Sequence, residues 1–194
     1  MEKYKIANKL DLKDFKKMEQ IEHNYFPNEN VTVAEEVYKW YLKNPDTCFA
    51  ILNETDEVIA SCNLLPLKPM VIEKIMKEQL DEATITDKQI EVYEEGKVYD
   101  LYLSAISIDP AYRNQISILK LLIKKVVAFF VKLEEQNITI RQIMAEASTK
   151  QGENICKKLL KMVCQKELPN GTKFYVIQQI DKEEILEQMK RIIH

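Results

Sequence analysis

Arg113 lies in a short polar loop, residues 111–115, between two long apolar stretches. The first stretch is predicted to be a strand, Val98–Ile108, and the second a helix that begins near Ile116. The first amides of a helix have no partner within it, so they can donate hydrogen bonds to an anion beyond the carboxyl end of the strand. Open α/β sheets bind their ligands at this end of the strands. The loop therefore predicts an anion-binding site, to which the Arg113 guanidinium adds positive charge.

Four side chains of the predicted strand, Asp100, Tyr102, Ser104 and Ile106, project to one face because side chains alternate along a strand. Asp100 could remove a proton through a water molecule, and so could Glu146 on the predicted neighbouring strand. A tyrosine with an ordinary pKa near ~10 is a poor base at neutral pH. Tyr102 is therefore better explained as a residue in the wall of a site, with its hydroxyl hydrogen-bonded.

The composition excludes several classes of protein. With 194 residues, of which 46% are hydrophobic and 30% charged, the chain is expected to form one domain over residues 1–194. The net charge of −3 argues against nucleic acid as the main partner. No stretch is typical of a signal peptide or a membrane span, so we expect a cytoplasmic protein without a membrane partner. A homodimer remains open. The cysteines form no CxxC pair and only two histidines are present. We therefore expect buried thiols and no metal site. The cysteines are Cys48, Cys62, Cys156 and Cys164.

Two helices are expected in the N-terminal part of the chain. A short strand over residues 4–10 comes first, and Asp11 is a plausible cap for the helix that follows it. The spacing of Thr32 and Glu35 is that of a capping box and predicts the start of the second helix.

An antiparallel hairpin is expected next, because two strand-like stretches, residues 48–53 and 58–65, are only four residues apart. Pro66 and Pro69 are expected to end the second of these strands. Residues 69–96 have the weakest periodicity in the chain, and we interpret them as an insertion that lies over the sheet.

The C-terminal half alternates between helices and strands. The helix from Ile116 carries one apolar stripe and is expected to end at Asn137. The strand after it should lie parallel to Val98–Ile108 with a right-handed crossover. After the helix from Ile116 we expect a strand, a helix, a last strand and an amphipathic C-terminal helix, at residues 138–147, 150–163, 173–180 and 181–194.

The end of the central strand and the loop after it resemble a phrase of the GNAT family of N-acetyltransferases. The residues are Ile108-Asp109-Pro110-Ala111-Tyr112-Arg113, and members of that family end a strand in Val/Ile-x-Pro-x-Tyr-Arg. The expected element order is also similar to that of the family over nearly the whole chain. The resemblance implies an α/β (α+β) fold, a GNAT-like domain with a mixed central sheet flanked by helices, here followed by the C-terminal amphipathic helix.

The resemblance also implies where acetyl-CoA would bind. The family's loop, Gln/Arg-x-x-Gly-x-Gly/Ala, opens a helix and holds the pyrophosphate, whereas here Ile116 and Ile118 occupy both small positions. Glycine suits such a loop because a backbone without Cβ lets a diphosphate approach the amides. We expect Ile118 to point into the core and Ile116 to crowd the diphosphate. The implied cofactor-binding residues are Ile106, Ile108, Arg113, Asn114, Gln115, Ile116, Ser117, Ile118 and Asn154.

Acetyl transfer to an amine requires the removal of a proton from an ammonium group and the departure of a thiolate. Departure is the easier step, because a thiol pKa near ~8.5 makes a fair leaving group. Several family members carry a glutamate base at the position of Tyr102, so the resemblance implies that Tyr102 and Asp100 belong to the catalytic site. The tyrosine that usually serves as general acid in the helix after Asn154 is absent. Cys156 in that helix is expected to be a core residue, because no histidine lies near it in sequence.

Three functions follow as hypotheses. The first is an acetyl-CoA-dependent N-acetyltransferase that acts on a small-molecule or peptide amine. The second is a GNAT-like module that binds or regulates without catalysis, which the two isoleucines and the absent tyrosine would explain. The third is an assembly role for the amphipathic tail, residues 181–194.

Overall fold

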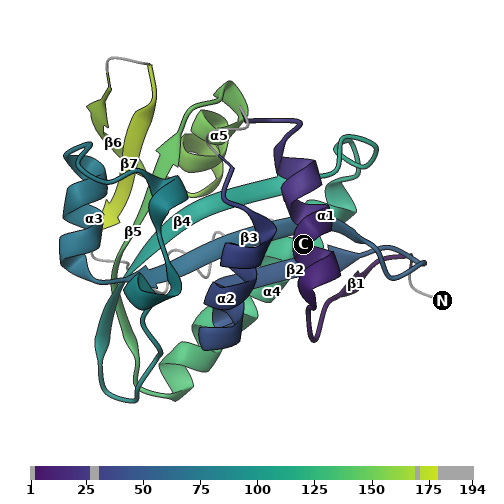
Figure 1. The fold of residues 1–194 in the computed structure, drawn as a ribbon, viewed down its shortest axis with the longest axis horizontal. Coiled ribbons are helices and arrows are strands. Elements are labelled where there is room, and N and C mark those ends of the chain that lie inside the picture. The colour runs from purple at the N-terminus through teal and green to yellow at the C-terminus, as the bar shows by residue number, and fades with distance from the viewer. Residues whose placement is uncertain (1–2, 27–30, 169–170, 179–194) are drawn as a thin grey trace.

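A mixed seven-stranded sheet in the order β1-β2-β3-β4-β5-β7-β6 forms the centre of the molecule (Figure 1). The computed structural model describes residues 3–26, 31–168 and 171–178. Neighbouring strands are antiparallel except for β4 and β5, which run parallel. The strands are β1 (Lys5–Ile6), β2 (Cys48–Leu52), β3 (Val58–Leu67), β4 (Val98–Ile108), β5 (Thr139–Ala147), β6 (Val163–Glu167) and β7 (Lys173–Gln178).

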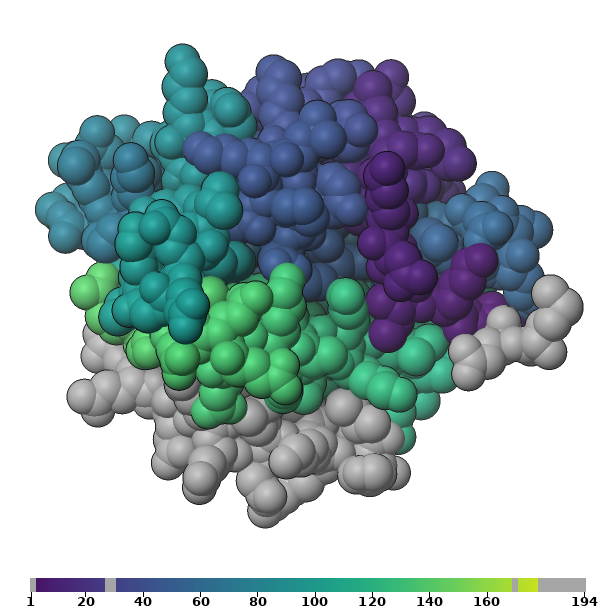
Figure 2. All heavy atoms as spheres, turned by 90° about the horizontal axis from the view of Figure 1, so that it is seen from below, coloured from purple at the N-terminus to yellow at the C-terminus, as the bar shows by residue number. Residues whose placement is uncertain are grey.

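Helices cover both faces of this sheet. In Figure 2, α1 and α2, in purple to blue, lie on one side of the molecule, and α4, in green, lies on the other. The helices are α1 (Leu12–Glu22), α2 (Ala34–Lys43), α3 (Pro69–Met76), α4 (Ile116–Glu135) and α5 (Lys150–Asn154). Shorter turns are the 3-10 helices η2 (Pro45–Thr47), η3 (Glu82–Thr84) and η4 (Asp87–Gln89) and the π-helix η5 (Ile155–Leu159).

Strand β4 lies in the middle of the sheet and contributes to the core on both faces. Leu101 and Leu103 pack in the cluster that includes Phe129 of α4. Tyr102, between them in sequence, belongs to the cluster on the opposite face with Trp40 of α2. This alternation follows from the pleat of a strand. The predicted central position of Val98–Ile108 is therefore confirmed, and with it the predicted mixed sheet.

The predictions that rest on strong local patterns are confirmed. Strands β2 and β3 form the expected antiparallel hairpin, and β5 lies parallel to β4 after the long helix α4. The insertion contributes α3, η3 and η4 between β3 and β4. Asp11 caps α1, where its side chain accepts hydrogen bonds from the amides of Lys13 and Asp14.

Three N-terminal predictions are wrong in detail. Strand β1 is only Lys5–Ile6, because the chain turns from the sheet toward α2, where the amide of Leu10 donates to the Tyr41 hydroxyl at 3.2 Å. The second helix is capped by Val33 without a side-chain hydrogen bond, so the capping box of Thr32 does not form. Strand β3 continues through Pro66 to Leu67.

The helix predicted over residues 150–163 is present but ends too late in the prediction. Helix α5 ends at Asn154, and the π-helix η5 carries the chain to Leu159. Lys161 then adopts a left-handed backbone with φ of 54°, which turns the chain into strand β6. All five residues of β6 are exposed, so this edge strand has no apolar alternation that sequence could reveal. The predicted C-terminal helix, residues 181–194, lies outside the described residues.

Candidate functional site

Strands β4 and β5 pair over only part of their length. Their pairing runs from Val98 and Thr139 to Leu103 and Ala145. Beyond this point β4 pairs with β3 and β5 pairs with β7, so the two strands diverge (Figure 1). The diverging edges do not bond to each other, which leaves backbone polar groups that need other partners. An extended ligand with amide groups can hydrogen-bond to such strand edges.

A cavity of about 330 Å³, here called the cleft, lies between the diverging strands. The end of β4 lines one side, and the end of β5 and the start of α5 line the other. The loop that precedes α4 contributes Arg113 and Asn114. The cleft therefore joins unpaired strand edges to a cationic loop at a helix N-terminus, an arrangement suited to a long ligand with an anionic end.

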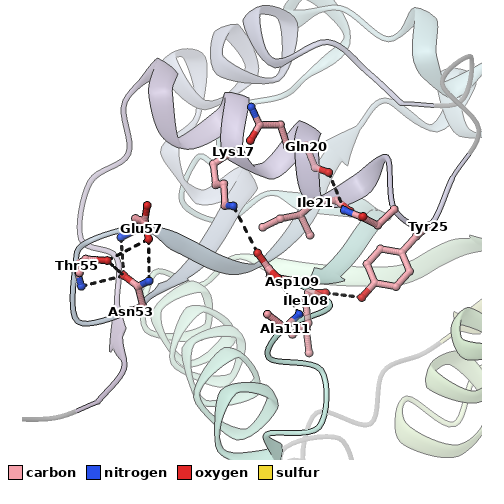
Figure 3. A network of polar contacts seen from close by, with 11 residues as sticks. Lys17, Gln20, Ile21, Tyr25, Asn53, Thr55, Glu57, Ile108, Asp109 and Ala111 are labelled. Carbon is pink, nitrogen blue, oxygen red and sulfur yellow. Dashed lines mark hydrogen bonds and ion pairs between the residues drawn. The ribbon is translucent and has the colours of Figure 1, made fainter.

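The loop after β4 is anchored to Lys17 of α1 and to Tyr25 in the segment after α1 (Figure 3). The Lys17 ammonium lies 3.5 Å from the carboxylate of Asp109, which also accepts a hydrogen bond from the Ala111 amide at 2.9 Å. The Tyr25 hydroxyl donates to the carbonyl of Ile108 at 2.5 Å. These contacts hold the end of β4 in place where the chain turns toward α4.

Some of the predicted cofactor-binding residues line the cleft and others do not. Gln115 is turned toward Tyr4, whose hydroxyl donates to its side chain. Ser117 is exposed near the start of α4. Asn154 does not line the cleft, whereas the two residues after it do. Four of the predicted residues line it: Ile106, Ile108, Arg113 and Asn114.

The two isoleucines of the loop motif have opposite surroundings. Ile118 is fully buried in the core beneath α4, as expected. Ile116 is 71% exposed and is not among the residues that line the cleft. The expectation that Ile116 crowds a bound diphosphate therefore finds no support, because its side chain points to solvent.

A second cavity of about 330 Å³ lies on the face of the sheet that α1, α2 and the insertion cover. We call it the acidic cavity, because no basic side chain is among the described residues that line it. The two cavities share residues where β4 and β5 diverge, among them Ser104, Glu146 and Ser148. The carboxyl groups that line the acidic cavity are Glu22, Glu78, Asp81, Glu82 and Glu146.

Hydrogen bonds connect side chains of β4, β5 and η3 at this junction. The Tyr102 hydroxyl donates to Glu82 at 2.6 Å and lies 3.5 Å from Glu146. The Ser104 hydroxyl donates to the other oxygen of Glu82. Ser104 is the extra residue of an irregularity in the β3–β4 pairing, where Asn63 faces Ala105. We call Tyr102, Ser104, Glu82 and Glu146 the Tyr102 network.

Burial changes the protonation of this network. It raises the pKa of Glu82 to about 7, against the opposing effect of the hydrogen bonds from Ser104 and Tyr102. Burial also raises the pKa of Glu146, and it raises that of Tyr102 well above its ordinary value. Tyr102 therefore remains a protonated donor near neutral pH, in agreement with the expectation that it is a poor base. A carboxyl group with a pKa near 7 is suited to accept a proton at physiological pH.

Asp100, the other predicted catalytic residue, is engaged elsewhere. Its carboxylate is buried and accepts hydrogen bonds from the Arg141 guanidinium, one of them at 2.8 Å. It lines a smaller cavity of about 170 Å³ together with Pro69 and Ile72 of α3. Asp100 lines neither the cleft nor the acidic cavity, so the structure argues against a role in proton transfer.

Sequence reasoning missed Glu82, the residue that joins Tyr102 and Ser104. It lies in η3, within the insertion whose periodicity is too weak to predict a position. Cys156 lines the cleft, but burial raises the pKa of its thiol to about 11. A thiol of this kind stays protonated and is a poor nucleophile, in agreement with the expected core role.

The described part of the chain has neither a metal-binding cluster nor a membrane-spanning helix. No group of three or more histidine, cysteine or acidic side chains there is arranged to hold a metal ion. Among the same residues, no helix combines the length and apolar character that crossing a membrane requires.

Comparison with known proteins identifies the fold. No family model and no curated protein sequence matches the chain. Among solved structures, a GNAT-family acetyltransferase from Desulfovibrio desulfuricans is 18% identical, with a TM-score of 0.52, over 90% of this chain and 98% of that one. The GNAT-like decarboxylase GphF in complex with isobutyryl-CoA is 13% identical, with a TM-score of 0.58, over 91% and 99%. Mutant forms of the spermidine/spermine N-acetyltransferase SpeG from Vibrio cholerae are 11% identical, with a TM-score of 0.51, over 96% and 98%. The chain therefore has the fold of the GNAT acetyltransferases.

Proposed function

We propose that the protein is an acyl-CoA-dependent N-acetyltransferase, with acetyl-CoA in the cleft and an amine in the acidic cavity. The observation that carries this proposal is the junction of the two cavities at Ser104 and Glu146. A thioester bound in one cavity and an amine bound in the other would meet beside the Tyr102 network. Bringing two reactants together in this way supplies a large part of the acceleration of a group transfer.

The chemistry of the junction fits an amine nucleophile. Carboxylates draw an ammonium group into the acidic cavity, and the ammonium must lose a proton before its nitrogen can attack. The Glu82 carboxylate, with a pKa of about 7, accepts that proton, directly or through a water molecule. The nitrogen then bonds to the carbonyl carbon as the carbon–sulfur bond breaks, and CoA leaves as a thiolate. A thiol pKa near ~8.5 lets the thiolate leave without a strong acid.

The solved structures support both halves of this proposal. GphF binds isobutyryl-CoA, and SpeG is an N-acetyltransferase for spermidine and spermine. In this chain the backbone edges of the cleft suit the amide groups of CoA, and Arg113 suits its phosphates. We extend the acceptor class to small-molecule or peptide amines.

Two measurements test the proposal. Acetyl-CoA should raise the melting temperature, because a ligand present at 100 times its Kd stabilises the folded state by about 2.7 kcal/mol. Release of the CoA thiol in the presence of a primary amine should then be measurable, and Glu82→Gln should lower kcat/KM by roughly 10²–10⁴-fold. Glu73→Gln is the matched control, because Glu73 lies on the exposed side of α3 and does not line the acidic cavity.

The outcome also decides between catalysis and binding alone. The helix that follows Asn154 lacks the tyrosine expected of a general acid, which favours the alternative of a non-catalytic binding module. Acetyl-CoA binding without transfer to any amine would support that alternative. Failure to bind acetyl-CoA at all would overturn the proposed function.

A further inference from the structure

The carboxyl groups of the acidic cavity differ in whether they already have partners. Glu78 forms an ion pair with Lys166 at 2.9 Å. Asp81 caps η3, because its carboxylate accepts a hydrogen bond from the Ala83 amide at 2.9 Å. Glu82 and Glu146 interact with the Tyr102 hydroxyl. Only the carboxyl group of Glu22 has no hydrogen bond or ion pair with any described residue, although Glu22 is only 9% exposed.

A buried carboxyl without a partner is costly when ionised. Burial, together with the charges of Glu82 and Glu19, raises the pKa of Glu22 to about 8. A ligand cation placed beside Glu22 removes this cost and displaces its proton. Glu22 is therefore a second anionic position, separate from the carboxylates that would receive the reacting amine.

Two further residues of the acidic cavity carry buried polar atoms without partners. Trp40 of α2 is 1% exposed, and its indole N–H has no acceptor among the described residues. Asn63 of β3 is 3% exposed, and its side-chain oxygen has no donor in the same part of the chain. Buried polar groups are nearly always hydrogen-bonded, so each exception calls for an explanation. A ligand that brings an acceptor to Trp40 and a donor to Asn63 supplies the missing partners.

We propose that the acceptor is an amine with two positive charges, a neutral carboxamide or hydroxyl group and no carboxylate, and that Glu22, Trp40 and Asn63 select it. This inference rests on the proposed function, since it names the substrate of the same site. The reacting amine lies at the Tyr102 network, and the second cation lies at Glu22. The neutral group donates to Asn63 and accepts from Trp40. A carboxylate is excluded because no cation lines the cavity among the described residues.

Four small amines test this selection by equilibrium binding without acetyl-CoA. Lysinamide has both cations and a carboxamide, norleucinamide lacks the second cation, cadaverine lacks the carboxamide and lysine adds a carboxylate. Lysinamide should bind at least about tenfold more tightly than each of the others, the effect of one charge or hydrogen-bond partner. Equal affinity for lysinamide and norleucinamide would overturn the role of the second cation. Equal affinity for lysinamide and cadaverine would overturn the role of the neutral group. Equal affinity for lysinamide and lysine would overturn the exclusion of carboxylates.

Variants assign these preferences to residues. Glu22→Gln should reduce the preference for lysinamide over norleucinamide about tenfold, and Glu35→Gln, at an exposed position on α2, should leave it unchanged. Calorimetry near pH 7.5 in two buffers of different ionisation enthalpy should show proton release on lysinamide binding in the native protein and less in Glu22→Gln. Equal release in both would show that Glu22 is not the second site.

Trp40→Phe and Asn63→Leu should weaken lysinamide binding and leave cadaverine binding unchanged. An equal effect on both ligands would contradict the role of Trp40 and Asn63 in binding the neutral group. If one of these variants does not fold, the affinities of the four amines and the Glu22→Gln variant still test the proposal. Acetyl-CoA binding is measured separately. Selection among the amines without acetyl-CoA binding would overturn the proposed acetyltransferase function and support the proposed amine site. Acetyl-CoA binding without selection among the amines would overturn the proposed amine site and leave the acetyltransferase function standing.

Discussion

Glu82, Tyr102 and Glu146 come from three separate segments of the chain, and their oxygen atoms meet at the junction of two cavities. The phenol donates, and the carboxyl groups accept. Hydrogen bonds from Tyr102 and Ser104 favour the ionised form of Glu82, whereas burial favours its neutral form. The balance leaves a pKa of about 7, at which small changes in surroundings alter the fraction that is ionised.

Tyr102→Phe should therefore shift the pH dependence of acetyl transfer. Loss of the donated hydrogen bond raises the pKa of Glu82 further, so the acidic limb of the kcat/KM profile should move to higher pH, by about one pH unit. Activity should fall most below pH 7 and be largely retained at pH 9. A uniform loss at all pH values would indicate that Tyr102 acts only through packing.

Glu22→Gln should change how stability depends on pH. The folded-state pKa of Glu22, about 8, lies above its ordinary value of 4.5. The folded protein therefore holds this proton more tightly, and stability is lost as pH rises from 4.5 toward 8, by at most about 1.4 kcal/mol per pH unit. Urea denaturation should show the variant to be more stable than the native protein at pH 9 and closer to it at pH 5. The same difference at both pH values would contradict the predicted ionisation.

At the scale of elements, the loop between β4 and α4 is expected to hold the anionic end of the ligand. Its Arg113 is exposed and lines the cleft. Arg113→Ala should weaken CoA binding by about 1–3 kcal/mol, the contribution of a charged hydrogen bond. Calorimetry with CoA measures this directly. Lys124→Ala, which removes an exposed cation farther along α4, is the control. Equal affinities of Arg113→Ala and the native protein would exclude Arg113 from the site.

Helix α4 itself is held by its buried stripe rather than by its first residue. Ile118→Ala should lower the free energy of unfolding by about 2–5 kcal/mol, because it opens a hole in the core. Ile116→Ala should change it by less than about 0.5 kcal/mol, since Ile116 is exposed. Ile116→Gly should likewise leave CoA affinity unchanged. Tighter CoA binding by Ile116→Gly would show that its side chain reaches the ligand after all.

For the molecule as a whole, the sheet brings together the two cavities that the proposed reaction would use. Helix α4 covers one face, and α1, α2 and the insertion cover the other (Figure 2). Where β4 and β5 diverge, beyond Leu103 and Ala145, the cleft and the acidic cavity share Ser104, Ala105 and Glu146. Under the proposed function, the divergence of one parallel strand pair would provide both the binding site for CoA and its access to the amine.

Elements that carry strong local patterns could be predicted from the sequence. The strand Val98–Ile108, the helix from Ile116, the β2–β3 hairpin and the parallel crossover to β5 are all found as predicted. Burial of Ile118 followed from its place in the apolar stripe of the helix. These features depend on periodicity and spacing within a short stretch, and both can be read without knowledge of distant contacts.

Which side chains meet depends on long-range packing. Tyr102 and Asp100 share a strand, yet one bonds to Glu82 and the other to Arg141. The register of β4 and β5 and the path of the insertion set these partners, and neither leaves a periodic signal in the sequence. The exposed edge strand β6 has none either. The fold was therefore predictable from local patterns, whereas the site required long-range packing, because proton transfer depends on atoms that residues distant in sequence bring together.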